Sequence, residues 1–381
     1  MSDAAPPPVR IEERLDRGGP QVAWLRLPAF VFGVVASLRG WLYSRGLLPA
    51  RRVSAPVVCV GNLSAGGTGK TPFVLWVCRQ LQALDLRPAI VSRGYRADQL
   101  ERAEGAERGL PKPGGGGPRG DEARLFARAL PGVRHVTDAD RVRGARQAVE
   151  AGADAIVLDD GFQHRRLIRD LDLVLVDATR PWGLAWPAGQ ARAPRGLLPR
   201  GLLREAPGAL RRAQAVVLTR CDQLAPERLA GLKGEIEELA PGVPVALGRH
   251  APQRLLDSGG GVHELSRLAD REVDAVSGIG RPEAFERTLE SLGARVREHR
   301  SFPDHHAYRP LDLVGLGAGG VPVLTTTKDL VKLETLLPQV LALEVEFELM
   351  EGAPPLLALL EALPVAQGKR EREHLHEGLH G

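Results

Sequence analysis

The stretch VVCVGNLSAGGTGKTP, residues 57–72, decides the fold. Its first residues, Val57–Gly61, form a continuous β-branched and apolar run, which predicts a strand buried on both faces of a parallel sheet. A glycine loop follows. The apolar periodicity from Pro72 to about Leu84 then predicts a helix with a proline in its first turn. The order of strand, glycine loop and helix predicts a site that binds phosphate groups.

This loop supplies the groups that a nucleoside triphosphate needs. Glycines let successive backbone N–H groups surround an anion, and the helix N-terminus adds positive potential. Lys70 is placed to reach the β- and γ-phosphates, and the hydroxyl of Thr71 can bind Mg²⁺. Ser64 stands where the common pattern has its first glycine. The predicted nucleotide-binding residues are Gly66, Gly67, Thr68, Gly69, Lys70 and Thr71.

Short apolar runs and helical patterns alternate along the rest of the chain, which indicates a doubly wound sheet. We therefore predict an α/β fold, a P-loop NTPase-like doubly wound parallel sheet with a second, smaller α/β domain. Strands are expected at 88–91, 155–158, 173–176, 215–218 and 243–247, and helices at 122–130, 141–151 and 226–239. In the second domain we expect strands at 273–277, 294–299, 321–325 and 341–349.

Composition suggests where the domains divide. Residues 249–262 lapse into Pro, Gly and Ser, so we place the boundary there. Two long segments, 96–119 and 179–207, interrupt the first domain, and loops of that length are usually functional or disordered. The predicted segments are a disordered extension over 1–22, an interfacial membrane-associating helix within 23–50, a P-loop domain over 51–250, the smaller domain over 251–366 and a disordered tail over 367–381.

The overall composition excludes several classes of protein. With 381 residues, 43% of them hydrophobic, the chain can bury a core, so neither global disorder nor a disulfide-stapled scaffold is expected. The net charge is only +4, which does not indicate the concentrated basic stripe of a nucleic-acid-binding protein. The three cysteines have no metal-type spacing and predict reduced thiols in a cytosolic compartment.

An apolar segment near the N-terminus, LRLPAFVFGVVASLRGW, occupies residues 25–41. Its uninterrupted part, Leu27–Leu38, is too short for a bilayer span of about 20 residues. Flanking arginines and aromatic residues suit a helix lying in a membrane interface. A helix packed on the domain explains the same pattern, and the residues alone leave both interpretations open.

Acidic residues follow a second predicted strand. Asp159 and Asp160 end the apolar run 155–158, where a P-loop fold holds Mg²⁺ or its water shell. The pair Asp121 and Glu122 opens a predicted helix, and either a helix cap or a functional acid explains it. We therefore predict Thr71, Asp159 and Asp160 as the metal ligands.

The predicted second domain carries FPDHHAY, residues 302–308. Asp304 beside His305 and His306 offers proton transfer near neutral pH, and we favour acid–base or orienting work over a structural role. Lys328, another of the rare lysines, follows three threonines at a strand-to-helix junction. The spacing does not decide whether it contacts phosphate or caps a helix.

Taken together, these motifs resemble those of the tetraacyldisaccharide 4′-kinases, the lipid A 4′-kinases of Gram-negative envelope synthesis. Single motifs are weak, but their number and order between about residues 39 and 361 are specific. Thr327 departs from the pattern, since a glutamate is expected there. The matching motifs are VGN (60–62), GGTGKTP (66–72), SRGY (92–95), GDE (120–122), LDDGFQH (158–164), DATRP (177–181), LP (198–199), LRE (203–205), SGIG (277–280) and DHHAY (304–308).

The resemblance implies a kinase that uses ATP and Mg²⁺ to phosphorylate the 4′-hydroxyl of a tetraacylated disaccharide 1-phosphate. On that reading Lys70 is catalytic, Asp121 accepts the proton of the hydroxyl, and His305 with Asp304 orients that base. The resemblance also implies that the two domains close over the substrate.

The acylated substrate stays in the bilayer, which favours the interfacial interpretation of residues 23–50. It implies a peripheral or monotopic protein on the cytoplasmic face of the inner membrane, with no nucleic-acid partner, and leaves the oligomeric state open. The rival hypothesis is a P-loop GTPase or ATPase switch, supported by TRCD (219–222), a degenerate guanine-reading motif.

Overall fold

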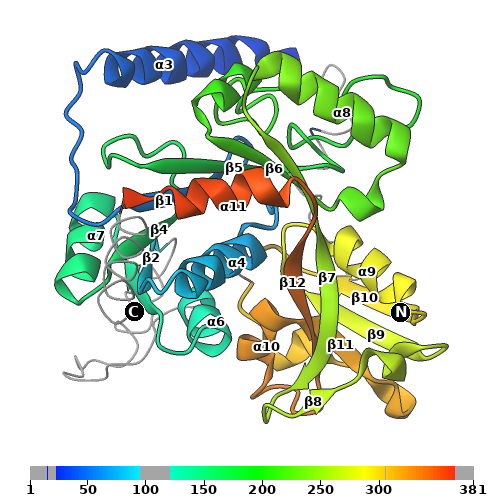
Figure 1. The fold of residues 1–381 in the computed structure, drawn as a ribbon. Coiled ribbons are helices and arrows are strands. Elements are labelled where there is room, and N and C mark those ends of the chain that lie inside the picture. Colours follow the sequence, from blue (N-terminus) through cyan, green and yellow to red (C-terminus); the bar gives the residue numbers. More distant parts are fainter. Residues whose placement is uncertain (1–14, 16–22, 95–120, 305, 365–381) are drawn as a thin grey trace, which may run out of the picture.

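The computed structural model describes residues 15, 23–94, 121–304 and 306–364, and all strands of this part join one sheet (Figure 1). The side chains of Asp121 and Glu122 are also outside the description. The strand order is β10-β9-β11-β12-β7-β6-β5-β1-β4-β2-β3, and β8 pairs with β7. The strands are β1 (Val57–Asn62), β2 (Pro88–Ser92), β3 (Arg134–Thr137), β4 (Ala155–Asp159), β5 (Leu171–Asp177), β6 (Ala215–Thr219), β7 (Val245–Asp257), β8 (Val262–His263), β9 (Glu272–Ser277), β10 (Arg295–Ser301), β11 (Val323–Thr326) and β12 (Leu341–Glu351).

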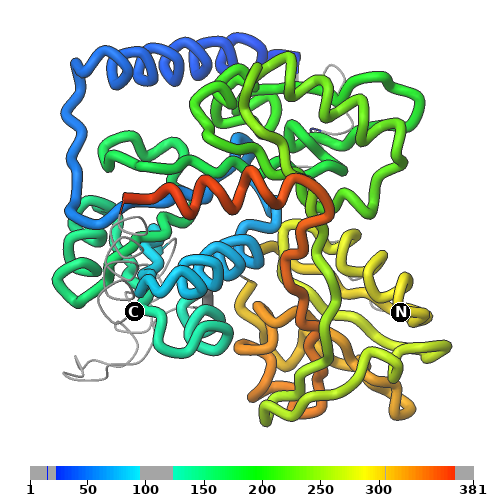
Figure 2. The backbone as a smooth tube through the Cα atoms, viewed as in Figure 1, coloured from blue at the N-terminus to red at the C-terminus, as the bar shows by residue number. Residues whose placement is uncertain are grey.

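Two parallel halves make up this sheet. Strands β7-β6-β5-β1-β4-β2-β3 form the larger half, and β12-β11-β9-β10 form the smaller one. The only antiparallel pairing between these halves in the described residues joins β7 to β12. Figure 2 shows these two long strands side by side as they run from the upper to the lower part of the molecule.

Helices cover both faces of the larger half because its strands are buried on both sides. Val57 and Cys59 of β1 pack in one core with α7 (Arg141–Glu150) and α8 (Pro226–Leu239). Val58 and Val60 pack in the opposite core with α4 (Lys70–Ala83), α6 (Asp121–Ala129) and α11 (Ala353–Glu361). In the smaller half, α9 (Pro282–Ser291) and α10 (Thr327–Leu333) belong to separate cores.

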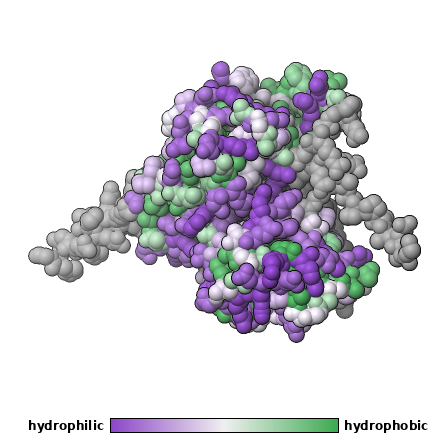
Figure 3. Space-filling model, turned by 90° about the vertical axis from the view of Figure 1, so that its right-hand side faces the viewer, coloured by the Kyte–Doolittle hydropathy of each residue, from purple (hydrophilic) through white to green (hydrophobic). Residues whose placement is uncertain are grey.

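Helix α3 (Arg26–Ser44) lies across the top of the molecule in Figure 1. Its large apolar side chains recur every three or four residues but face outward, which reverses the usual pattern of a surface helix. By length and composition the whole of α3 could cross a membrane, although its uninterrupted apolar part, Leu27–Leu38, was expected to be too short for a span. Hydrophobic side chains also gather at the upper right of the space-filling view in Figure 3. The outward-facing residues are Leu27, Phe30, Val31, Val34, Val35, Leu38 and Trp41.

The predicted fold class is confirmed, and the predicted strands lie within a few residues of the observed ones. The last strand of the first predicted domain is longer than expected, because β7 continues through residues 249–257. Pro252 is tolerated there because it adjoins a β-bulge in β7: Glu344 pairs with Arg254 and the next residue, Val345, pairs with Pro252, so Gln253 is left over. The boundary placed between residues 250 and 251 therefore lies inside β7. Apart from Leu15, the predicted disordered ends lie outside the described residues, and so does the whole of the long segment 96–119.

We expect Gly61→Ala to destabilise the protein by about 1–3 kcal/mol, because overpacking a filled core strains it. A Cβ at position 61 would lie 2.6 Å from the Cβ of Phe162 and 2.9 Å from its backbone nitrogen. Gly208→Ala is the control, since a Cβ there meets nothing within 4 Å. Urea unfolding of both variants measures the difference, and equal stabilities would contradict the packing at Gly61.

Candidate functional site

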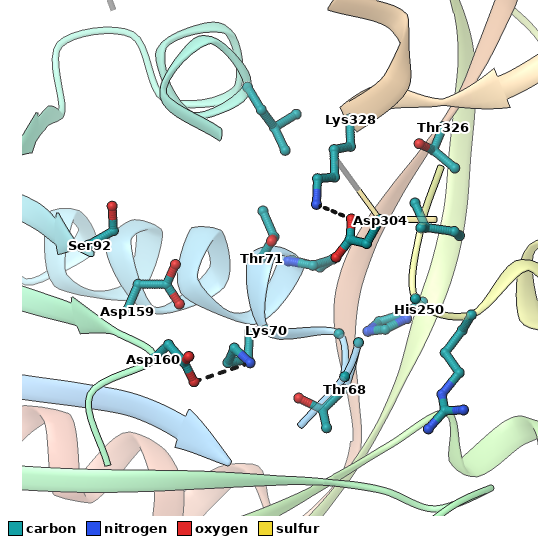
Figure 4. Close-up of a pocket in the computed structure, with 18 of the residues that line it drawn as sticks. Thr68, Lys70, Thr71, Ser92, Asp159, Asp160, His250, Asp304, Thr326 and Lys328 are labelled. Atoms are coloured by element: carbon teal, nitrogen blue, oxygen red, sulfur yellow. Dashed lines mark hydrogen bonds and ion pairs between the residues drawn. The ribbon is translucent and has the colours of Figure 1, made fainter. Parts of the chain in front are cut away.

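A cavity of about 970 Å³ lies beside the loop between β1 and α4, with walls from both halves of the sheet. The larger half supplies the predicted loop residues Gly66–Thr71 together with Asp159 and Asp160. The smaller half supplies Asp304 and Lys328 (Figure 4). Parallel pairing of β1 with β4 sets Val60 opposite Asp159, which explains why the acids at the end of β4 reach the loop.

The predicted phosphate loop joins strand to helix as its sequence indicates. Gly69 has φ +78° and precedes the first helical residue, Lys70. A side chain at Gly69 would also collide with the ring of His250 on β7, so glycine is needed there for two reasons. His250 was not predicted as a site residue, because nothing in its local sequence marks it.

Lys70 reaches across the loop to an acid of β4. Its Nζ lies 3.3 Å from Oδ1 of Asp160 and donates to Oδ1 of Asn62 over 3.2 Å. Burial would raise the pKa of Asp160, but Lys70 and Arg204 hold it below its ordinary value. Asp160 is therefore ionised and fixes the lysine beside the loop.

Arg204 is a site residue that sequence reasoning did not assign. Its NH1 donates to both carboxylate oxygens of Asp160 at 2.9 Å. The residue belongs to the LRE motif, and its position there was the only signal that could have identified it. The oxygens of Asp160 are thus engaged by two cations.

Asn62, the last residue of β1, holds the phosphate loop through hydrogen bonds. Its side-chain amide donates to the backbone oxygen of Ser64 over 2.7 Å and to Oγ1 of Thr68 over 3.1 Å. Its own backbone oxygen accepts from Nε2 of Gln163 over 3.0 Å. Asn62 is fully buried, so these bonds replace the water that its polar atoms lose.

The predicted metal ligands are hard oxygen donors. Asp159 is 8% exposed, and Figure 4 shows its carboxylate beside Asp160 and near Lys70 and Thr71. Within the described residues no three His, Cys, Asp or Glu side chains form a metal cluster. A hydroxyl and one or two carboxylates suit Mg²⁺, which keeps several waters and binds substrate phosphates.

The smaller half brings a charged pair to the opposite wall. Nζ of Lys328 donates to Oδ1 of Asp304 over 2.7 Å, and both residues line the cavity. Asp329 instead turns inward and accepts from the backbone N–H of Gly278 and the hydroxyl of Thr326. The position of Lys328 therefore differs from that of a capping residue, which the sequence could not decide.

The remaining predicted residues are His306, His305 and Asp121. His306 turns away from the cavity, since its Nε2 lies 3.1 Å from Oδ2 of Asp312 and its ring stacks on Phe302 with centroids 4.4 Å apart. His305 lies outside the described residues. Asp121 begins α6, but its side chain is not described.

The sequence model of the tetraacyldisaccharide-1-P 4′-kinases matches residues 22–363. The chain belongs to this family. The match covers most of the chain and includes both walls of the cavity. As a member of this family the chain is a lipid A 4′-kinase, and the regulatory switch is not favoured.

Individual relatives are similar to this chain over most of their own length. A tetraacyldisaccharide 4′-kinase of Anaeromyxobacter dehalogenans is 45% identical over 91% of this chain and 92% of its own. One from Syntrophus aciditrophicus is 40% identical over 84% and 86%. The crystal structure of "apo" form LpxK from Aquifex aeolicus in complex with ATP has a TM-score of 0.67 at 32% identity, covering 89% of this chain and 98% of that one.

We expect the free energy of unfolding to fall as the pH is lowered from 6.5 towards 4. Burial lowers the pKa of His135 and His164 to about 4 and that of His250 to about 3. The unfolded chain binds protons on histidine near pH 6.5, so acid favours the unfolded state by at most about 1.4 kcal/mol per pH unit for each residue.

Urea unfolding at several pH values measures this slope. The variant His250→Gln cannot take up the proton, so its slope should be shallower than that of the wild type between pH 6.5 and 4. Equal slopes would contradict a neutral, buried His250.

Proposed function

We propose that this chain transfers the γ-phosphoryl group of ATP to the 4′-hydroxyl of a tetraacylated disaccharide 1-phosphate in this cavity. The observation that carries the proposal is Lys70, held between the phosphate loop and the ionised Asp160 in the cavity where the two halves meet. Phosphoryl transfer needs mainly positioning and charge neutralisation, and the cavity offers both.

The phosphate groups of ATP bind the loop from Gly66 to Thr71. Its backbone N–H groups and the N-terminus of α4 attract the anion, and Lys70 neutralises the charge that develops on the transferred group. Asn62 keeps Lys70 at the loop, because its Oδ1 accepts a hydrogen bond from Nζ. The ATP complex of the Aquifex aeolicus relative supports this use of the site.

Thr71 and Asp159 would hold Mg²⁺. Asp160 is the weaker candidate of the two acids, because both of its oxygens are engaged by Arg204 and one of them also by Lys70. Asp160 instead positions these two cations. When bound, Mg²⁺ would neutralise charge on the phosphate oxygens.

Asp121 accepts the proton of the sugar hydroxyl. Leu125 of α6 lines the cavity, and position 121 precedes it by one helical turn on the same helix. His305, which follows Asp304 in the sequence, orients this base. The assignment passes over His306, which is engaged by Asp312.

The acceptor lipid reaches the cavity from the membrane along α3. The outward stripe of this helix includes Leu27 at 70% and Phe30 at 68% exposure, and such a face suits acyl chains better than water. Arg39 of the same helix lines the cavity. Arg165 donates to the backbone oxygen of Gly40, which ties α3 to the loop after β4. These contacts support a peripheral or monotopic attachment through α3, and the proposed site of action is the cytoplasmic face of the inner membrane.

We retain the division into a kinase domain over 51–250 and a smaller domain over 251–366. The two are connected through β7 and β12, whose antiparallel pairing continues across residue 250. Closure of the smaller domain would bring Asp304 and Lys328 towards the phosphate loop.

The decisive experiment incubates the protein in detergent micelles with Mg²⁺-ATP and tetraacyldisaccharide 1-phosphate, and weighs the lipid by mass spectrometry. A lipid heavier by one phosphoryl group, formed with ATP in preference to GTP, supports the proposal. GTP hydrolysis without a phosphorylated lipid would revive the switch hypothesis.

We expect Lys70→Ala to abolish this turnover, because it removes the cation beside the transferred group.

Asp121→Asn should slow the chemical step by roughly 10²-fold or more, the usual contribution of a general base, and leave ATP affinity unchanged. Turnover and ATP binding by calorimetry measure both effects. Normal turnover of Lys70→Ala would contradict the loop assignment, and an unchanged rate for Asp121→Asn would leave that residue as a helix cap.

We expect Phe30→Asp to weaken binding to lipid vesicles, because it places a charge on the stripe of α3 that would meet acyl chains. Co-sedimentation with vesicles measures binding, and ATP affinity should not change. Leu311→Asp is a matched control, since Leu311 is 74% exposed and lies on the smaller half. Equal loss in both variants, or in neither, would contradict a specific role of α3.

A further inference from the structure

A buried charge cluster lies directly behind the phosphate loop. It consists of Asp177 at the end of β5, Arg220 after β6 and Arg281 at the start of α9, which are 1%, 7% and 6% exposed. NH1 of Arg220 pairs with Oδ2 of Asp177, and Nε of Arg281 lies 3.7 Å from the same oxygen. One carboxylate thus faces two guanidinium groups, which leaves a net positive charge within the protein.

The cluster and its neighbour Thr219 hold two carbonyl groups of the loop. NH1 of Arg220 donates to the backbone oxygen of Gly67 over 3.2 Å. Oγ1 of Thr219 donates to the backbone oxygen of Thr68 over 2.9 Å. Because the N–H and C=O of a trans peptide point in opposite directions, anchoring the Thr68 carbonyl turns the N–H of Gly69 the other way. The anchored carbonyls are also turned away from the anion, which they would repel.

The smaller half of the sheet contributes to the same arrangement. A Cβ at Gly280 would lie 2.9 Å from the backbone nitrogen of Gly67, so the loop after β9 rests directly on the phosphate loop. Arg281, the next residue, lines the cavity and donates to the backbone oxygen of Gly183 over 3.3 Å. The phosphate loop is therefore braced from β5, β6 and the smaller half together.

We infer that Asp177, Thr219, Arg220 and Arg281 are positioning residues that set the affinity of this chain for the triphosphate of its nucleotide. Asp177 holds both arginines, Arg220 and Thr219 fix the carbonyls of the loop, and Arg281 links the smaller half to it. The inference rests on the proposed function only in placing a nucleotide triphosphate at the loop. It gives a shared physical role to the DATRP, TRCD and SGIG segments.

The sharpest test is a pair of substitutions at Thr219. Thr219→Val keeps the shape of the side chain and removes the hydroxyl, whereas Thr219→Ser keeps the hydroxyl. We expect the Kd for Mg²⁺-ATP, measured by calorimetry on the full chain without lipid, to rise about threefold to tenfold in the valine variant. The Kd of the serine variant should lie within about twofold of the wild-type value, because serine keeps the hydroxyl that donates this hydrogen bond.

Thr325→Val is the matched control. Thr325 is also fully buried at a strand end, and its Oγ1 donates to the backbone oxygen of Val276 over 2.8 Å, away from the phosphate loop. This variant loses the same kind of bond and should lower the melting temperature without changing the Kd for ATP. A general loss of packing would move both threonine variants alike.

Two further variants test the charged part of the cluster. Arg281→Gln should raise the Kd and the KM for ATP and leave the KM for the lipid unchanged, and Arg281→Lys should recover part of the loss. Asp177→Asn should have the largest effect on ATP affinity, and the Thr219 pair decides the question if that variant does not fold.

An ATP Kd of Thr219→Val equal to that of the wild type and of Thr219→Ser would overturn the inference. So would an equal rise in Thr325→Val. Failure of the proposed function gives a different result, since a wild type that binds ATP but phosphorylates no lipid leaves these binding measurements intact.

Discussion

The antiparallel pairing of β7 with β12 is the constraint on which the cavity depends. The strands of each half pair in parallel, apart from the short β8 beside β7, and in the described residues only the pairing of β7 with β12 joins the two halves into one sheet. It carries the ends of β10 and β11 to the side of the molecule where the phosphate loop emerges from β1. Asp304 follows β10 and Lys328 follows β11, and both residues line the wall opposite the loop.

Within the cavity, opposite charges are arranged so that each ion fixes another. Lys70 lies between Asn62 and Asp160, and Asp160 is in turn held by Arg204. Behind the loop, Asp177 holds two arginines in the same manner. A buried ion is costly unless its partners satisfy it, so these groups have little freedom to move. Such rigidity is what phosphoryl transfer requires, because its catalysis depends on positioning.

The placement of α3 relates the site to its substrate class. The helix turns its apolar stripe outward and is tied to the core by Arg165 and by the close contact of Gly33 with Leu197. Arg39 extends from the same helix to the cavity. In the proposed function, this one helix would present a surface for acyl chains and a cation for the polar part of the acceptor.

The sequence by itself determined the local structure of the site. Three local features carry this information: the apolar run of β1, the glycines after it and the paired acids at the end of β4. Backbone sterics and the burial of parallel strands act over a few neighbouring residues, so these features predict the strand, the loop and the acidic strand end directly. For that reason the sequence could predict that Lys70, Thr71, Asp159 and Asp160 lie together beside the loop, where all four line the cavity. The number and order of the motifs also indicated the family, and the family implied the kinase activity.

Only the tertiary structure decided which distant residues complete the site. Arg204 meets Asp160, His250 packs on Gly69 and Thr219 anchors Thr68 because the sheet order and register bring these segments together. Local pattern holds no information about such pairings, since they depend on which strands become neighbours. The same limit explains why β7 ran past its predicted end: the partner that stabilises it, β12, lies about 90 residues further along the chain.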